Sequence, residues 1–280
     1  MRIESLSQLG IGSLQKTLTG SVEQTNKKLS SVLEKLATGQ RINRASDDAA
    51  GLAVAEGLIT QTRGFKMAMR NTEDGVSALN ISDGASNETT AILQRQRELA
   101  VQARNATLSD NERQALDKEF QQLTQEMDRI SNVTNFNKQE LTNGQGLGAG
   151  GAQLQVGANE GEMVAVPGMD ISVSALGISG SSINSISGAD MAITAIDSAL
   201  GVVNQQRSDV GAMTNRLEST IRNLQTADVN TTAAQSIIRD QDMALGIAEM
   251  VKNQVLGKSG INAFSIFNKI SADHILGLIK

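Results

Sequence analysis

The stretch ITAIDSALGVVNQQRSDVGAMTNRLESTIRNL, residues 193–224, decides the fold class. Apolar side chains recur along it at alternating steps of three and four residues, and only Arg207 and Thr214 interrupt the series. The apolar positions are Ile193, Ile196, Leu200, Val203, Val210, Leu217, Ile221 and Leu224. This heptad spacing lines one side of a coiled-coil helix. A seam so narrow needs partner helices, so the segment predicts a long helix packed against others.

Both ends of the chain carry related stripes. In the N-terminal arm the apolar positions are Leu14, Leu18, Val22, Leu29, Val32 and Leu36. With Thr25 included they step by three or four residues, with one extra step of four, which predicts a helix over residues 5–37. In the C-terminal arm a looser stripe passes through Ile247, Val251 and Val255. The sequence therefore predicts a helix at each end of the chain.

Two further helices are expected between these arms. The first, over residues 46–105, opens with Ser46 as a cap, and Asp47 and Asp48 complement the positive end of a helix dipole. At 1.5 Å per residue it would be about 90 Å long, which predicts a rod. The second begins at the capping box formed by Ser109 and Glu112 and carries the stripe Leu116, Phe120, Leu123, Met127 and Ile130.

The middle of the chain is neutral and rich in turn residues. No basic residue lies between Lys138 and Arg207, and this interval holds the glycine run GQGLGAGG, residues 144–151. The segment LQVGANEGEMVAV, residues 154–166, alternates partly and is broken by glycines, which predicts a β-hairpin. The overall expectation is a mainly α fold: an elongated rod of long antiparallel coiled-coil helices with a small β-hairpin region.

Composition argues against most catalytic chemistry. The chain has no cysteine and a single histidine, so we expect no metal site and no cofactor. The formal net charge of -5 disfavours nucleic acid as a partner. The glycine run follows a polar turn rather than a buried strand, so it does not predict a nucleotide site. We expect a protein that is not an enzyme, with no catalytic residues.

Neither a membrane span nor a cleaved signal peptide is expected. No window of the sequence reaches the 18 or so consecutive apolar residues of a span, and the opening MRIESLSQLGIGSLQ lacks an apolar core. If the protein is secreted, this pattern requires a dedicated export route.

Several segments resemble the signatures of bacterial flagellins. They are LATGQRINRASDDAAGLAVAEGL at residues 36–58, LQRQRELAVQ at 93–102, TNFN at 134–137, LQVGAN at 154–159 and RSDVGAMTNRL at 207–217. The resemblance implies a filament subunit whose paired N- and C-terminal helices build an inner coiled-coil tube, surrounded by a rod of helices that carries a hairpin. Only a short stretch separates Val166 from the long C-terminal helix, so the resemblance implies a minimal flagellin without the variable outer domains.

The resemblance also implies a division of the chain into five parts. These are an N-terminal inner-tube helix (1–42), rod helices (43–140), a hairpin and turn region in place of the outer domains (141–186), a C-terminal rod helix (187–240) and a C-terminal inner-tube helix (241–280). The polymerisation core would consist of Leu14, Leu18, Val22, Leu29, Val32, Leu36, Ile247, Val251 and Val255. Asn43 and Arg44 form a polar linker between the first two parts.

A possible receptor contact follows from the same resemblance. Arg95 and Leu99 match the positions that an animal Toll-like receptor contacts in this family, and Glu119 matches an acidic contact on the following helix. Gln96 departs from the apolar residue usual there. The three matching residues would then share one exposed surface of the rod.

The function implied is that of a structural subunit that self-assembles into the bacterial flagellar filament for motility. Its partners would be further copies of itself, the flagellar export apparatus and an export chaperone, hook-associated and cap proteins, and the Toll-like receptor. It would be secreted into an extracellular filament, or a periplasmic one in organisms with internal flagella. The alternatives are a hook-filament junction protein of the same superfamily and, from another class, a secreted coiled-coil adaptor.

Overall fold

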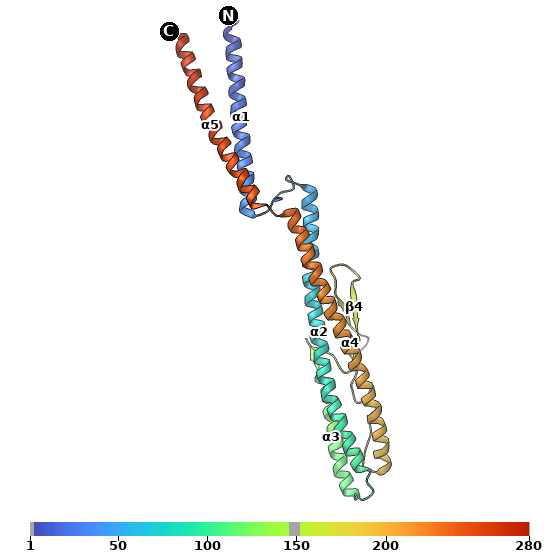
Figure 1. Cartoon of the computed structure of the whole chain (residues 1–280). Coiled ribbons are helices and arrows are strands. Elements are labelled where there is room, and N and C mark those ends of the chain that lie inside the picture. The colour runs from blue at the N-terminus through green and yellow to red at the C-terminus, as the bar shows by residue number, and fades with distance from the viewer. Residues whose placement is uncertain (1–2, 146–151, 280) are drawn as a thin grey trace. The chain divides into compact units, whose positions relative to one another are not determined.

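The computed structural model describes residues 3–145 and 152–279, so most of the glycine run lies outside the described residues. Over these residues the chain forms five helices, α1 (Ile3–Thr38), α2 (Ala49–Ala103), α3 (Asp110–Val133), α4 (Ile186–Arg239) and α5 (Met243–Ile279) (Figure 1). Two small antiparallel sheets pair β1 (Asn135–Phe136) with β2 (Gln139–Glu140), and β3 (Ala152–Gln155) with β4 (Met163–Val166). The expected mainly α fold is confirmed.

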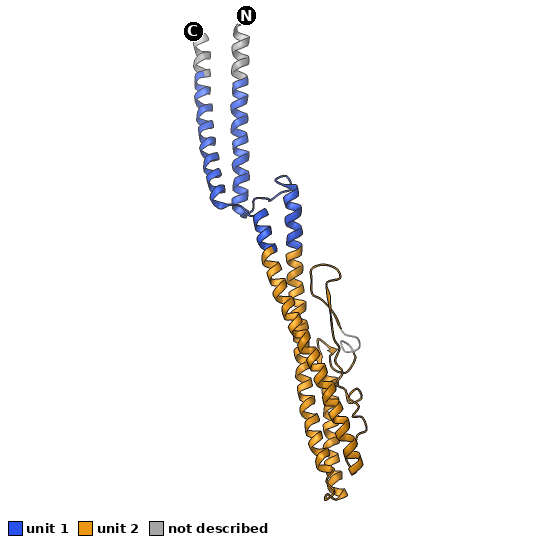
Figure 2. Cartoon of the chain, turned by 45° about the vertical axis from the view of Figure 1, so that its right-hand side comes forward, with its two compact units in different colours: residues 1–60, 231–280 blue, residues 61–230 orange. Residues whose placement is uncertain are grey.

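The chain divides into two compact units (Figure 2). One unit joins the two ends of the chain and consists of residues 1–60 and 231–280, and the other consists of residues 61–230. In the first unit α1 and α5 pack against each other and run in opposite directions (Figure 1). The expected pairing of the N- and C-terminal helices is therefore confirmed.

The heptad seam of α4 forms the centre of the second unit. Ile196, Val203, Val210 and Leu217 are all buried there, as the spacing predicts. Arg207, the charged residue in this seam, lies at its margin, where its Nε donates to Asp83 Oδ1 at 2.9 Å. The polar interruption is thus satisfied by an ion pair with α2.

Three ion pairs fix the direction of α2 relative to α4. Asp83 pairs with Arg207, Arg97 with Asp197 and Arg104 with Asp190, so residue numbers rise along α2 as they fall along α4. The two helices are therefore antiparallel. Leu93 and Leu99 of α2 and Phe120 and Met127 of α3 complete the apolar core. Each is at most 1% exposed.

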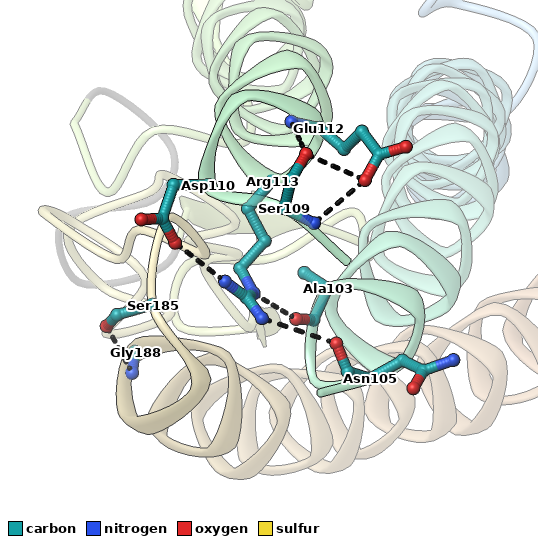
Figure 3. A network of polar contacts seen from close by, with 8 residues as sticks. All are labelled: Ala103, Asn105, Ser109, Asp110, Glu112, Arg113, Ser185 and Gly188. Atoms are coloured by element: carbon teal, nitrogen blue, oxygen red, sulfur yellow. Dashed lines mark hydrogen bonds and ion pairs between the residues drawn. The ribbon is translucent and has the colours of Figure 1, made fainter. Parts of the chain in front are cut away.

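The turn between α2 and α3 is held by side chains that cap both helices (Figure 3). The capping box predicted from Ser109 and Glu112 is present, with the Ser109 N–H donating to Glu112 Oε2 at 2.8 Å. These hydrogen bonds lower the pKa of Glu112, the largest contribution being that from the Ser109 N–H. The buried Arg113 donates to the carbonyl oxygens of Ala103 at 2.9 Å and Asn105 at 3.3 Å, which satisfies the last turn of α2.

The predicted hairpin forms and lies on α2. Leu154 of β3 pairs with Val164 of β4, and a Cβ added at Gly75 of α2 would lie 2.6 Å from Leu154 Cδ2. A glycine on α2 therefore makes room for the hairpin. The β1–β2 ribbon was not predicted. It turns through Asn137 and Lys138, whose φ angles are 50° and 66°.

Helix α4 contains an 18-residue window with a mean hydropathy of 1.4, which by length and composition alone could cross a membrane. The sequence analysis expects no membrane span, because polar residues interrupt this window and it holds no continuous apolar run. Ile196 and Val203 in this part of α4 face the protein core, whereas Asp197 forms an ion pair with α2. We therefore interpret its apolar residues as a core seam.

Candidate assembly surface

The predicted stripe of α1 forms its seam with α5. Leu18, Val22, Thr25, Leu29, Val32 and Leu36 are partly buried, at alternating steps of four and three residues. Leu14, the first residue of the predicted set, is 54% exposed. The seam is incomplete in a single chain, because none of these side chains is fully buried there.

Helix α5 meets α1 through glycines. Gly246 and Gly257 are buried, and Gly260 is partly buried. A Cβ added at Gly246 would lie 2.8 Å from Leu36 Cδ2, and one added at Gly260 would lie 2.9 Å from Val22 Cγ2. Contacts under 3.0 Å require a shift, so the missing side chains allow α1 to approach α5 closely.

This seam differs from the stripe predicted for α5. Ile247 and Val251 are each 48% exposed and Val255 is 57% exposed, so they lie outside the contact with α1. The predicted stripe of α5 therefore does not form the contact with α1 within one chain, and its place in the polymerisation core stays a prediction. The true seam includes Gly246 and Gly257, which a search for large apolar residues passes over. The spacing of the glycines was the signal that could have found it.

Helix α5 carries many large apolar side chains that stay exposed in the single chain. Large apolar side chains that are 48% to 59% exposed on this helix are Met243, Leu245, Ile247, Val251, Val255, Leu256, Ile261, Ile266 and Ile270. We call these nine residues the outer face of α5. Exposed apolar side chains in such number are common at protein–protein contacts, so this face of α5 is the candidate assembly surface.

A hollow lies between α1 and α5 beside the glycine seam. It has a volume of about 190 Å³ and is lined by Thr19, Val22, Glu23, Asn26, Ile261 and Phe264. Gly260 lies in the same part of α5, where a Cβ would lie 2.9 Å from Val22 Cγ2. The α1–α5 pair therefore presents both a recess and protruding apolar side chains.

Two of the three expected receptor-contact residues lie together on the surface of the second unit. Arg95 Nη2 donates to Glu119 Oε1 at 2.8 Å, and Arg95 Nη1 donates to Glu98 Oε2 at 3.0 Å. The hydrogen bond to Glu119 is the main cause that raises the pKa of the Arg95 guanidinium. Both side chains remain open to solvent, Arg95 being 51% and Glu119 43% exposed.

Leu99 does not belong to that surface. It is 1% exposed and packs in the core, so the expectation that all three residues share one exposed surface is wrong. Gln96 is also buried, and its Nε2 donates to Thr124 Oγ1 at 2.7 Å. The residue that departs from the family pattern therefore joins α2 to α3 inside the protein.

Comparison with known proteins covers both helical arms. Residues 13–146 match the family model for the bacterial flagellin N-terminal helical region, and residues 193–278 match the model for the C-terminal helical region. A flagellin of Halalkalibacterium halodurans is 44% identical over 229 residues, which cover 81% of this chain and 83% of that protein. The flagellar filament 31.3 kDa core protein of Treponema maltophilum is 38% identical over 269 residues, covering 91% and 94%.

A solved structure agrees with these matches. The crystal structure of Bacillus cereus flagellin is similar with a TM-score of 0.50 and 30% identity, over 55% of this chain and 88% of that one. In the present chain β4 ends at Val166 and α4 begins at Ile186, so no inserted domain separates the hairpin from α4. The two family matches and the extended identity to flagellins establish that the chain belongs to the bacterial flagellin family.

Proposed function

We propose that this minimal flagellin builds the flagellar filament by packing the outer face of α5 against neighbouring copies of itself. The observation that carries the proposal is the exposure of nine large apolar side chains on one helix. A free chain gains nothing from them, because apolar surface in contact with water is unfavourable. A second copy of the α1–α5 pair offers a matching apolar surface.

The residues of the proposed polymerisation core then divide into two groups. The α1 residues Leu18, Val22, Leu29, Val32 and Leu36 hold α1 to α5 within one chain. Leu14 of α1 and Ile247, Val251 and Val255 of α5 are exposed and would contact neighbouring copies. This division assigns pairing to one group and assembly to the other.

The same surface explains why assembly continues into a filament. A contact between different patches of identical copies forms a ring if its rotation closes and an open helical polymer if it does not. The α1–α5 pair carries both protruding apolar side chains and a recess, and these are two different patches through which identical copies could contact each other head to tail. Names of the relatives, flagellin and flagellar filament core protein, support the polymer.

The further partners follow from family membership and complete the proposal. They are the flagellar export apparatus and its chaperone, which would carry the chain out of the cell, and hook-associated and cap proteins at the filament ends. The filament would lie outside the cell or in the periplasm. The exposed Arg95–Glu119 pair is the part of the chain that we propose a Toll-like receptor reads.

Substitution of a single valine tests the assembly surface. We expect Val251→Asp to abolish seeded filament growth, because a charge in a buried contact loses the roughly 1.5–3 kcal/mol of an apolar side chain and adds a desolvation cost. Turbidity and negative-stain microscopy measure growth, and circular dichroism checks that the helices remain. The matched control is Val229→Asp on α4, where the valine is 66% exposed and lies outside the outer face.

Normal filaments from the Val251→Asp chain would contradict the proposal. Equal loss of growth in the Val229→Asp chain would show that the effect is not specific to α5.

A further inference from the structure

Charge is distributed unevenly along the second unit, residues 61–230, which holds 13 basic and 20 acidic residues. Its first and last segments, residues 61–72 of α2 and 219–230 of α4, lie together because the two helices are antiparallel (Figure 1). We call these two segments the basic end, because they hold four basic residues and one acidic residue. The rest of the unit holds nine basic and 19 acidic residues, so the two parts differ in the sign of their charge.

The cations of α2 at the basic end have no partner within the chain. Arg63, Lys66 and Arg70 are exposed, and their spacing of three and four residues places them on one face of the helix. Seven of the ten arginines in the described part of this unit form ion pairs, whereas Arg63 and Arg70 form neither an ion pair nor a side-chain hydrogen bond there. Like charges at this spacing repel each other. An anionic partner would therefore stabilise this face.

An apolar side chain lies among these cations. Met67 is 52% exposed, and it shares their face because it follows Arg63 by four residues and precedes Arg70 by three. Arginine and methionine are both enriched at protein–protein interfaces. The mixture favours a protein surface as the partner over a simple polyanion, which offers no apolar contact to the methionine.

The far end of the same unit has the opposite charge. We call residues 104–119 and 184–197 the acidic end, because they hold six acidic and three basic residues. The Asp110 side chain is 99% exposed, and its Oδ1 accepts from Nη1 of the buried Arg113 at 3.0 Å (Figure 3). Met191, which is 67% exposed, adds apolar surface. The acidic end therefore matches the basic end in both charge and apolar character.

The two ends cannot meet within one chain. Helix α2 runs without a break from Arg63 to its last residue, Ala103, over a length of about 60 Å. A second copy is needed to bring an acidic end to a basic end. Copies joined through opposite ends always leave one end of each kind free, so such a contact continues into an open polymer.

We propose that the basic end of one copy binds the acidic end of the next copy, head to tail, when the filament forms. Arg63, Lys66 and Arg70 then meet the carboxylates around Asp110, and Met67 covers apolar surface of the neighbour. Opposite charges select this pairing, since two basic ends or two acidic ends repel each other. The contact belongs to residues 61–230 and is separate from the outer face of α5. The proposal rests on the proposed function, which supplies the neighbouring copies.

Reversal of charge at each end tests the contact. Arg63→Glu, Lys66→Glu and Arg70→Glu together make the basic end negative, and we expect at least a tenfold rise, on the order of the cost of meeting like charges, in the subunit concentration needed for seeded growth. Asn111 and Gln114 of the acidic end are exposed and neutral. Asn111→Lys with Gln114→Lys therefore weakens the attraction without removing a carboxylate, and we expect a rise of about threefold.

The two sets of substitutions combined give the decisive result. In the parent chain the added lysines repel the basic end, whereas in the reversed chain they attract it. We therefore expect Asn111→Lys with Gln114→Lys to lower the concentration that the reversed chain needs by about threefold, which is the coupling that a direct contact produces. The same loss of growth in both backgrounds would overturn the proposal.

Cations outside both ends provide the matched control. Arg216 and Lys138 are exposed, and neither forms an ion pair within the described residues. Arg216→Glu with Lys138→Glu also makes the chain more negative, and we expect the concentration needed for growth to change by less than about twofold. A loss equal to that of the reversed basic end would show that net charge alone controls growth and would overturn the proposal. Circular dichroism checks that the helices remain in every variant.

Cross-linking tests the contact without reversing any charge. The parent chain has no cysteine, so Met67→Cys with Asn111→Cys introduces one thiol at each end. A short bismaleimide should join neighbouring copies in the filament into a ladder of multimers on a denaturing gel. The free subunit should stay monomeric, because its ends are about 60 Å apart. Met67→Cys alone is the control and should give no ladder.

The outcomes separate this contact from the proposed function. Filaments that grow normally but give no ladder would overturn the head-to-tail contact and leave assembly through the outer face of α5 standing. A parent chain that forms no filament would overturn both, because the contact depends on neighbouring copies.

Discussion

Single residues decide which parts of this flagellin are available to partners. Arg95 and Glu119 bond across α2 and α3 at the surface, whereas Leu99, one helical turn from Arg95, packs inside. The sequence analysis expects all three on one exposed surface, because motif matching depends on positions along the chain and not on burial. Only a structure separates the residues that a receptor can touch from those that support them.

Loss of Arg95 should affect signalling and not assembly. We expect Arg95→Ala to reduce the response of cells that carry the flagellin-sensing Toll-like receptor by about tenfold, the effect of one charged hydrogen-bonding group. Arg129→Ala is the control, since the Arg129 side chain on α3 is 58% exposed, against 51% for Arg95, and pairs locally with Glu126. Filament growth should be unchanged in both. A dose response equal to that of the parent chain would remove Arg95 from the receptor surface.

Asp47 should make the start of α2 sensitive to acid. Its Oδ2 accepts from the N–H groups of Arg44 at 3.1 Å and Asn43 at 3.2 Å, and these bonds, that from Arg44 first, lower its pKa. The pKa of an Asp carboxylate in the unfolded chain is about 3.9. A carboxylate whose pKa is lower in the folded chain stabilises the fold at pH values above this unfolded pKa, and the stabilisation is lost as the pH falls through the folded pKa. We therefore expect Asp47→Asn to reduce the loss of urea resistance between pH 5 and pH 3. An identical pH dependence in both chains would contradict this account.

The elements differ in how far the sequence predicts them. The α4 seam was predicted residue by residue, because Ile196, Val203, Val210 and Leu217 repeat every seven residues and all face one core. The capping box of α3 was predicted equally well, since Ser109 and Glu112 are three residues apart and bond to each other without help from the rest of the fold. The α5 seam was missed because its contacts are made at glycines, which carry no apolar side chain to count. The β1–β2 ribbon escaped because its turn depends on the backbone conformations of two polar residues.

The glycine seam makes the pairing of α1 with α5 sensitive to side-chain size. We expect Gly260→Leu to force the helices apart at Val22, which would lie 2.9 Å from the new Cβ, and to raise the concentration needed for filament growth by at least tenfold. Gly20→Leu is the control, since nothing lies within 4 Å of a Cβ at Gly20 of α1. Seeded growth followed by turbidity measures both. Parental growth of the Gly260→Leu chain would contradict the close contact between these helices.

On the scale of the whole molecule, the two units differ in whether a single chain completes their apolar core. Residues 61–230 fold around a core of α2, α3 and α4 that a single chain completes by itself. The other unit pairs α1 with α5 and leaves apolar surface on the outer face of α5. The sequence located apolar stripes at both ends but could not assign them to contacts within the chain or between chains. That assignment depends on which side of α5 meets α1, and it is the central claim of the account.

Chemical labelling of a single cysteine tests this claim most directly. Because the parent chain has no cysteine, Val251→Cys and Val229→Cys each introduce one thiol at an exposed valine. A maleimide reagent should modify both positions at similar rates in the free subunit. In the filament we expect labelling at position 251 to fall by about a hundredfold while position 229 stays reactive, because neighbouring copies cover the outer face of α5. Equal labelling of position 251 in subunit and filament would contradict the account.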